Sequence, residues 1–115
     1  MIETKRIYNA PSSDDGYRIL IDRLWPRGMS KEKAKLNLWM KEIAPSNELR
    51  TSFCHDPQKW EEFQREYRKE LAAKEDLVKQ IKQFEKERHV VTLVYSARDT
   101  EHNNAVTLKA FLEKK

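Results

Sequence analysis

Two short apolar runs stand out in the pattern of hydrophobic and polar residues along this chain. Residues 19–21 read ILI and residues 90–94 read VVTLV. Unbroken runs of this length are typical of strands buried on both faces in the middle of a parallel sheet. Each run leads into a polar, charged loop, at residues 22–30 and 96–104. Parallel strands end at the same edge of a sheet, so the pattern predicts that the two loops meet there.

Weaker patterns predict two further strands. The interior of residues 2–8 reads ETKR, which suits a strand at the sheet edge because charge there deters unwanted pairing. Leu36, Leu38 and Met40 recur at every second position, the period of a half-buried strand. Residues 9–16, NAPSSDDG, are expected to form a solvated connecting loop.

Helical spacing and capping residues account for the middle of the chain. Ser30 and Ser46 are N-cap candidates for short helices over residues 31–35 and 47–53. Asp56 followed by Pro57 predicts the start of a longer helical region, either one helix or two with a break at residues 72–76. Its apolar residues form two stripes that are expected to be core: Trp60, Phe63, Tyr67 and Leu71, then Leu77, Val78, Ile81 and Phe84.

A last helix is expected over residues 100–114. Ala105, Leu108 and Leu112 would face the sheet, and Asp99 is the expected N-cap. Strands interspersed with helices indicate a layered α/β protein. The predicted fold class is therefore α/β: a single layered domain over residues 1–115, with a mostly parallel sheet of about four strands flanked by helices.

Length and composition restrict the class of protein. The 115 residues suffice for one hydrophobic core but not for two. Cys54 is the only cysteine, which excludes an intrachain disulfide and suits a reducing compartment. No apolar run approaches the ~18 residues of a membrane span, and the N-terminus lacks the apolar segment of a signal peptide. The sequence predicts a soluble, cytoplasmic protein.

The net charge of +4 is distributed unevenly. Residues 1–35 hold eight Lys and Arg against five Asp and Glu. This surplus leaves open a basic surface for nucleic acid or protein, built from Lys5, Arg6, Lys31, Lys33 and Lys35. Because +4 over 115 residues is modest, nucleic-acid binding is expected to be weak and strongly salt-dependent.

The two loops that are predicted to meet carry the candidate site residues. They are Asp22, Arg23 and Arg27 in the first loop, and Ser96, Arg98, His102 and Asn103 in the second. Arginine presents a planar fork to carboxylate or phosphate, and a helix start favours an anion. Asp22 and His102 are the candidate general acid or base if the ligand is turned over. Structural alternatives remain open: Arg23 could pair with Asp22 or another acid, and His102 could be a surface residue.

Metal and cysteine chemistry have weaker signals. His55, Asp56 and His102, with Asp22 or Glu101, are conceivable metal ligands, but their spacing matches no compact ligand motif, so no metal is predicted. Cys54 is a poor candidate nucleophile, because its neighbour His55 would not face it on a helix. The glycine-based nucleotide-binding fingerprints are absent, and no particular cofactor is implied.

Four segments carry a resemblance that covers nearly the whole chain. They are GYRILIDRLWPRGMSKE, LWMKEIAPSNELR, FCHDPQKWEEFQREYRKEL and VTLVYSARDTEHNNAVTLKAFL. The chain resembles the domain of unknown function 488 family, in its short YeaO-like branch. The resemblance implies a small cytosolic bacterial or archaeal α/β protein and no established reaction. Its motif positions here are Asp22, Arg23, Trp25, Pro26, Arg27, Gly28, Ala44, Pro45, Ser46, Arg98, Asp99, His102 and Asn103. More distant relatives tend to have Cys-His-Arg where this chain has Glu101, His102 and Asn103, which makes cysteine chemistry less expected here.

Two functional hypotheses follow. The leading one is a domain that binds a small anionic ligand, such as a phosphorylated or nucleotide-like metabolite, with or without turnover. Arg23, Arg27 and Arg98 would hold the anion, with Ser96 and Asn103 beside them. The alternative is a nucleic-acid or protein-binding accessory module that uses the basic N-terminal third. A pocket requires the arginines to converge, whereas a nucleic-acid surface requires the basic residues to spread along one face.

Overall fold

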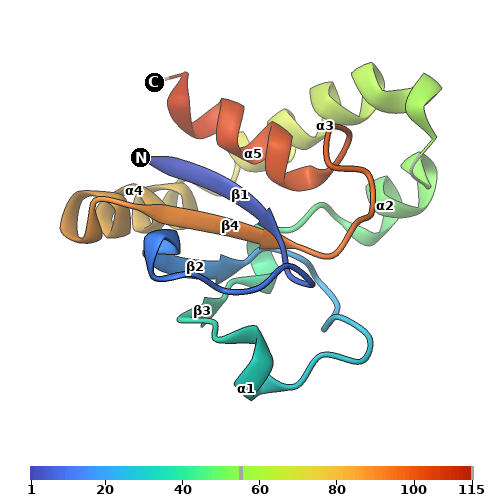
Figure 1. Ribbon diagram of the computed structural model, residues 1–115. Coiled ribbons are helices and arrows are strands. Elements are labelled where there is room, and N and C mark those ends of the chain that lie inside the picture. Colours follow the sequence, from blue (N-terminus) through green and yellow to red (C-terminus); the bar gives the residue numbers. More distant parts are fainter. Residues whose placement is uncertain (55, 115) are drawn as a thin grey trace.

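A computed structural model describes residues 1–54 and 56–114, and its centre is a four-stranded parallel sheet (Figure 1). The strands are β1 (Ile2–Arg6), β2 (Tyr17–Leu20), β3 (Leu38–Trp39) and β4 (Val91–Tyr95), in the spatial order β1-β4-β2-β3. All three neighbouring pairs are parallel. The predicted α/β class with about four mostly parallel strands is confirmed.

The central and edge positions are also as predicted. β2 and β4, which contain the apolar runs, lie in the middle, and β1 lies at an edge. Gly16, just before β2, has a φ of +65°, and a Cβ there would lie 2.3 Å from the Val90 carbonyl oxygen. Only glycine therefore lets the chain enter β2 so close to the start of β4. β3 is shorter than its pattern indicated, because a 3₁₀ turn at Lys41–Ile43 follows it directly.

Helices begin largely where the capping residues predicted. The Ser30 side chain accepts a hydrogen bond from the Lys33 N–H at the start of α1 (Lys31–Ala34), and Ser46 caps α2 (Asn47–Phe53) in the same way. Asp56 caps a 3₁₀ turn (Pro57–Lys59) that leads into α3 (Trp60–Ala72). The chain then breaks before α4 (Glu75–Arg88), so the second of the two predicted arrangements is correct. No helix of the described residues is both long and apolar enough to cross a bilayer.

The start of the last helix differs from the prediction. α5 spans Asn104–Glu113, and its N-cap is Asn103, whose side chain accepts a hydrogen bond from the Val106 N–H. Asp99 instead accepts hydrogen bonds from the Glu101 and His102 N–H groups, at 2.9 and 3.0 Å, in a separate turn. Asp and Asn are both good N-cap residues. The connection from β4 is longer than expected, so α5 begins at Asn104 and Asn103 is its N-cap.

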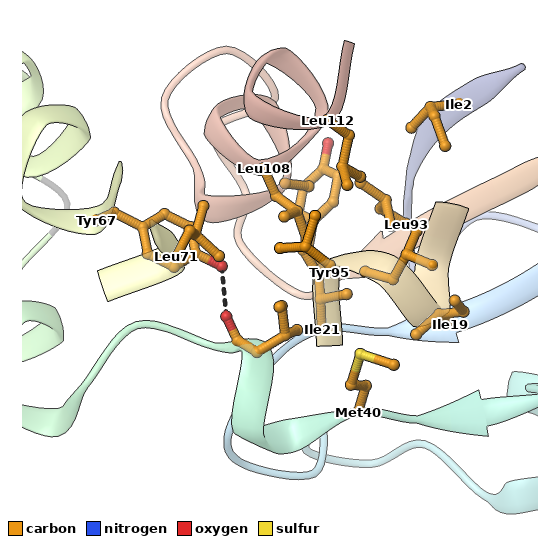
Figure 2. Close-up of a cluster of buried hydrophobic side chains, with 14 of the residues drawn as sticks. Ile2, Ile19, Ile21, Met40, Tyr67, Leu71, Leu93, Tyr95, Leu108 and Leu112 are labelled. Atoms are coloured by element: carbon orange, nitrogen blue, oxygen red, sulfur yellow. Dashed lines mark hydrogen bonds between the residues drawn. The ribbon is translucent and has the colours of Figure 1, made fainter. Parts of the chain in front are cut away.

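The larger part of the core lies between one face of the sheet and the helices α3, α4 and α5. Ile19 of β2, Ile21 directly after β2 and Leu93 of β4 project into this cluster. Figure 2 shows Leu108 and Leu112 of α5 packed toward the same strands, as predicted for this helix. A smaller cluster on the other face joins Leu20 and Val94 to Ala34 of α1, with Trp25 and Trp39 packed against it. Alternating strand residues thus serve two opposite layers.

The aromatic stripe of α3 is largely in the core. Phe63, Tyr67 and Leu71 are buried, whereas Trp60 is only half-buried at the start of the helix. The Tyr67 hydroxyl donates a hydrogen bond of 2.7 Å to the Ile43 carbonyl, drawn as the dashed line in Figure 2. This bond satisfies both buried polar groups and fixes α3 to the segment that follows β3.

The connecting loop at residues 9–16 is exposed as expected, except at Asp15. It contains a 3₁₀ turn (Ser13–Asp15) in which the Asp15 side chain is buried. Asp15 Oδ2 lies 2.6 Å from Arg18 Nη1, and Asp15 Oδ1 lies 3.0 Å from Lys5 Nζ. Burial raises the pKa of Asp15, but the Ser12 N–H, Lys5 and Arg18 outweigh it and lower the pKa below its ordinary value. Asp15 thus fixes this exposed loop to β1 and β2.

Candidate functional site

A pocket of about 570 Å³ lies at the carboxyl edge of the sheet. Its lining comes from Arg6 at the end of β1, from the 22–30 and 96–104 loops that follow β2 and β4, from Ala44 and Pro45, and from α2 and α3. The two loops, separated by some 75 positions in the sequence, therefore meet at one edge of the sheet as predicted. Asp22, Arg23, Arg27, Ser96, Arg98 and Asn103 all line this pocket.

The Asp22 carboxylate joins the two loops. Its Oδ2 accepts hydrogen bonds from the Ser96 N–H at 2.9 Å and from the Ser96 hydroxyl at 2.8 Å. Its Oδ1 accepts a third from the Asn104 side-chain amide at 3.0 Å, and that amide also donates to the Ile21 carbonyl. Asp22 thus ties the end of β2 to the loop after β4 and to the first turn of α5.

Five arginines line the pocket, and Asp22 is the one carboxylate among the described lining residues. The arginines are Arg6, Arg23, Arg27, Arg50 and Arg98. Because the single negative charge is itself occupied by three donors, most of the positive charge in the pocket is not neutralised by protein groups. Such a concentration of guanidinium groups attracts anions.

Two of the arginines donate hydrogen bonds to backbone carbonyls. Arg23 donates to the Ala44 and Pro45 carbonyls, at 3.2 and 3.3 Å. The sequence left open that Arg23 pairs with Asp22 or another acid. Its partners are instead these two carbonyls. Arg6 donates to the Ser96 and Ala97 carbonyls, at 3.3 and 2.8 Å, and lies over the Tyr8 ring. These two arginines hold the pocket walls in place.

Arg27 and Arg98 are different, because their guanidinium groups are exposed and make no hydrogen bond or ion pair with any described residue. The main chain at Arg27 is nevertheless fixed. Its carbonyl accepts a 2.8 Å hydrogen bond from the Tyr8 hydroxyl, and Gly28 turns the chain with a φ of +75°. The Trp25 indole N–H closes the same loop by donating to the Met29 carbonyl at 2.7 Å. Arg27 therefore presents a free cation from an anchored backbone.

Arg6 and Arg50 were not among the predicted site residues. Arg6 is the last residue of β1, and a parallel strand that ends at the same edge could have indicated it. Arg50 lies on α2, where its Nη2 donates to Asn47 Oδ1 at 3.1 Å. No pattern in the sequence indicates that α2 reaches the pocket, because only the path of the chain after β3 brings it there.

His102 is not among the described residues that line the pocket. Its Nδ1 lies 3.0 Å from Asp99 Oδ2, and its ring meets Trp60 edge to face with centroids 5.2 Å apart. The hydrogen bond from the Glu101 N–H, together with those from the His102 N–H and ring, lowers the pKa of the Asp99 carboxyl. His102 thus supports the start of α5 from the side of α3.

Asn103 and Ser96 line the pocket but are also engaged within the protein. The Asn103 side chain accepts from the Val106 N–H and donates to the Asp99 carbonyl at 2.8 Å. The Ser96 hydroxyl donates to Asp22. Both side chains shape the loop after β4 and leave the exposed arginines as the groups with free donors.

The described residues contain no group of three or more His, Cys, Asp and Glu side chains arranged to hold a metal ion. The conceivable ligand His55 lies outside the described residues. Cys54 is exposed at the C-cap of α2, with a φ of +46°.

Comparisons with known proteins place the chain in a family. The model of the family DUF488-N3i, described as the inactive DUF488-N3 subclade, matches residues 1–115. The chain is 42% identical over 111 residues to the uncharacterised protein YeaO of Escherichia coli (strain K12), covering 96% of each chain. It is 35% identical over 111 residues to an uncharacterised protein of Mycobacterium bovis, covering 96% of this chain and 92% of the relative. No solved structure matches.

The resemblance noted in the sequence is confirmed: the chain belongs to the DUF488 family, as a YeaO-like member that matches the inactive DUF488-N3 subclade.

Proposed function

We propose that this protein binds a small anionic ligand, such as a phosphorylated or nucleotide-like metabolite, in the pocket between the 22–30 and 96–104 loops. The observation that carries the proposal is the pair of exposed guanidinium groups, Arg27 and Arg98, which lack any partner among the described residues in a pocket with three further arginines. Converging cations repel one another, and a bound anion relieves that repulsion.

Several observations support binding without turnover. The Asp22 carboxylate is occupied by three hydrogen bonds, so it is poorly placed to take up a proton from a ligand. His102, the other candidate acid or base, packs against Trp60 and Asp99. The matching subclade is described as inactive. In this proposal Asp22 and His102 position the pocket walls, and Ser96 and Asn103 support the loop that presents Arg98.

The alternative of a basic surface for nucleic acid or protein has less support. Two of its five residues are engaged elsewhere: Lys5 in an ion pair with Asp15, and Arg6 with the backbone of the 96–104 loop. The other three lysines are exposed: Lys31 and Lys33 lie on the short helix α1, and Lys35 is its C-cap residue. Five arginines line one pocket, as anion binding there requires.

The test is thermal unfolding of the wild type and of Arg27→Ala and Arg98→Ala in the presence of phosphate, sulfate and a panel of nucleotides. Arg65→Ala is the matched control, because Arg65 is exposed on α3 and is not among the described lining residues. A ligand at a hundred times its Kd stabilises the folded state by about 2.7 kcal/mol. We expect at least one anion to raise the Tm of the wild type and of Arg65→Ala, and to leave both pocket variants unchanged. Equal stabilisation of all four proteins, or of none, would refute the proposal.

A further inference from the structure

The apolar residues of the pocket indicate what kind of body the ligand has, whereas the arginines indicate only its charge. The large hydrophobic side chains most exposed in the described part of the chain are Met1, Tyr8 and Leu24, with exposed fractions of 65%, 43% and 62%. Tyr8 and Leu24 both line the arginine pocket. Exposed apolar area concentrated at a binding site, rather than scattered, marks a surface that a bound molecule covers.

The Tyr8 ring is held rigidly while it remains exposed. Its hydroxyl donates to the Arg27 carbonyl at 2.8 Å, and the Arg6 guanidinium lies 4.9 Å from its ring centroid. A ring fixed in this way loses little freedom when a ligand packs on it, which favours binding. Tyr8 therefore offers a preformed apolar contact in the pocket that Arg27 also lines.

The size of the pocket also favours an organic ligand. At about 570 Å³ it falls within the range of sites for organic molecules, and an inorganic phosphate would fill only a small part of it. Beyond Tyr8 and Leu24, the lining includes Trp25, Pro26, Phe53 and Phe63. Water beside these apolar side chains gains few hydrogen bonds from them, so an apolar group displaces it favourably.

We propose that the ligand is an organic anion with a ring-containing apolar body, whose anionic group binds Arg27 and Arg98 while its body covers Tyr8 and Leu24. This rests on the proposed anion binding and specifies its ligand class. Selectivity then depends on the apolar contact, because the arginines by themselves accept any small anion. Leu24, exposed and outside the core, is the specificity-determining residue of this arrangement.

Calorimetric titration with three phosphates tests the proposal: inorganic phosphate, glycerol phosphate with a polar body, and phenyl phosphate with an aromatic body. We expect phenyl phosphate to bind at least about tenfold more tightly than the other two, the factor expected from burying a modest apolar area. Leu24→Ser should remove this preference and Leu24→Met should keep it. Benzoate and acetate repeat the comparison with a carboxylate, and a preference that depends on Leu24 in either set supports the proposal.

The other outcomes separate this inference from the function on which it rests. Equal affinity for all three phosphates, together with equal affinity for benzoate and acetate, would overturn the apolar specificity, and loss of that binding in Arg27→Ala would leave anion binding in place. A preference for phenyl phosphate that survives in Leu24→Ser would overturn the assignment of the body to this wall. Absence of binding by every anion would refute both proposals. Thermal unfolding of each variant without ligand verifies that the fold is intact.

Discussion

At the residue scale, the Asp22 carboxylate joins the 22–30 loop to the 96–104 loop. Removing its carboxylate in Asp22→Ala leaves the Ser96 N–H and hydroxyl without their acceptor, and leaves the Asn104 amide with the Ile21 carbonyl alone. We expect a loss of about 2–3 kcal/mol in the free energy of unfolding, because hydrogen bonds to a charged group are among the stronger ones. Asp22→Asn, which keeps one acceptor oxygen, should lose less. Urea denaturation measures both, and wild-type stability of Asp22→Ala would show that the carboxylate does not join the loops.

Asp15 gives the fold a dependence on pH. Because its pKa is lowered in the folded state, the stabilisation is complete above the unfolded pKa near 3.8 and is lost as the pH falls through the lower folded value. Asp15→Asn leaves the buried Arg18 without its counter-charge, and we expect a cost of about 3 kcal/mol at neutral pH. The difference in free energy of unfolding between Asp15→Asn and the wild type should become smaller below about pH 4.

Urea midpoints at pH 7 and pH 3 measure this difference. Asp14→Asn is the matched control, since Asp14 is exposed in the same turn. A deficit of Asp15→Asn that is as large at pH 3 as at pH 7 would contradict the role of its charge.

At the scale of elements, α3 shows where its apolar stripe contributes most to stability. Leu71 is fully buried between α3 and the sheet, whereas Trp60 is half-buried at the helix start beside His102. Leu71→Ala should therefore cost about 2–5 kcal/mol, as large-to-small core substitutions do. Trp60→Ala should cost less than the full value for a buried aromatic residue. Chemical denaturation of both variants checks the order, and a larger loss in Trp60→Ala would contradict it.

At the scale of the whole molecule, the charge distribution predicts how the protein meets nucleic acid. The net charge is modest, and the pocket concentrates arginines at one edge of the sheet. We expect only weak binding to a labelled oligonucleotide, with a Kd of about 10⁻⁶ M or higher near physiological salt. The Kd should rise further as the salt concentration rises. Fluorescence anisotropy in a salt series measures this. Sub-micromolar, sequence-selective binding, abolished by replacing Lys31, Lys33 and Lys35 with Ala, would favour the accessory-module alternative.

The sequence alone determined the local elements and the layered fold. The apolar runs at residues 19–21 and 90–94 indicated the two central strands, because a strand covered on both faces has no polar face to reveal. Ser30, Ser46 and Asp56 indicated helix starts, because capping acts within one turn of the residue itself. Parallel strand direction then brought the two motif loops to one edge of the sheet, and with them most of the predicted site residues.

The tertiary structure decided which residues pair across the site. Arg23 has backbone carbonyls for partners and Asp22 joins two loops, while Arg50 reaches the pocket from α2. Asn103 rather than Asp99 caps α5. Apart from this local cap, each of these outcomes depends on where segments distant in the sequence come to lie, and the strand order and the path after β3 set that arrangement. Residue type and spacing fix what a side chain can do, whereas the partner it meets is fixed by the packing of the whole chain.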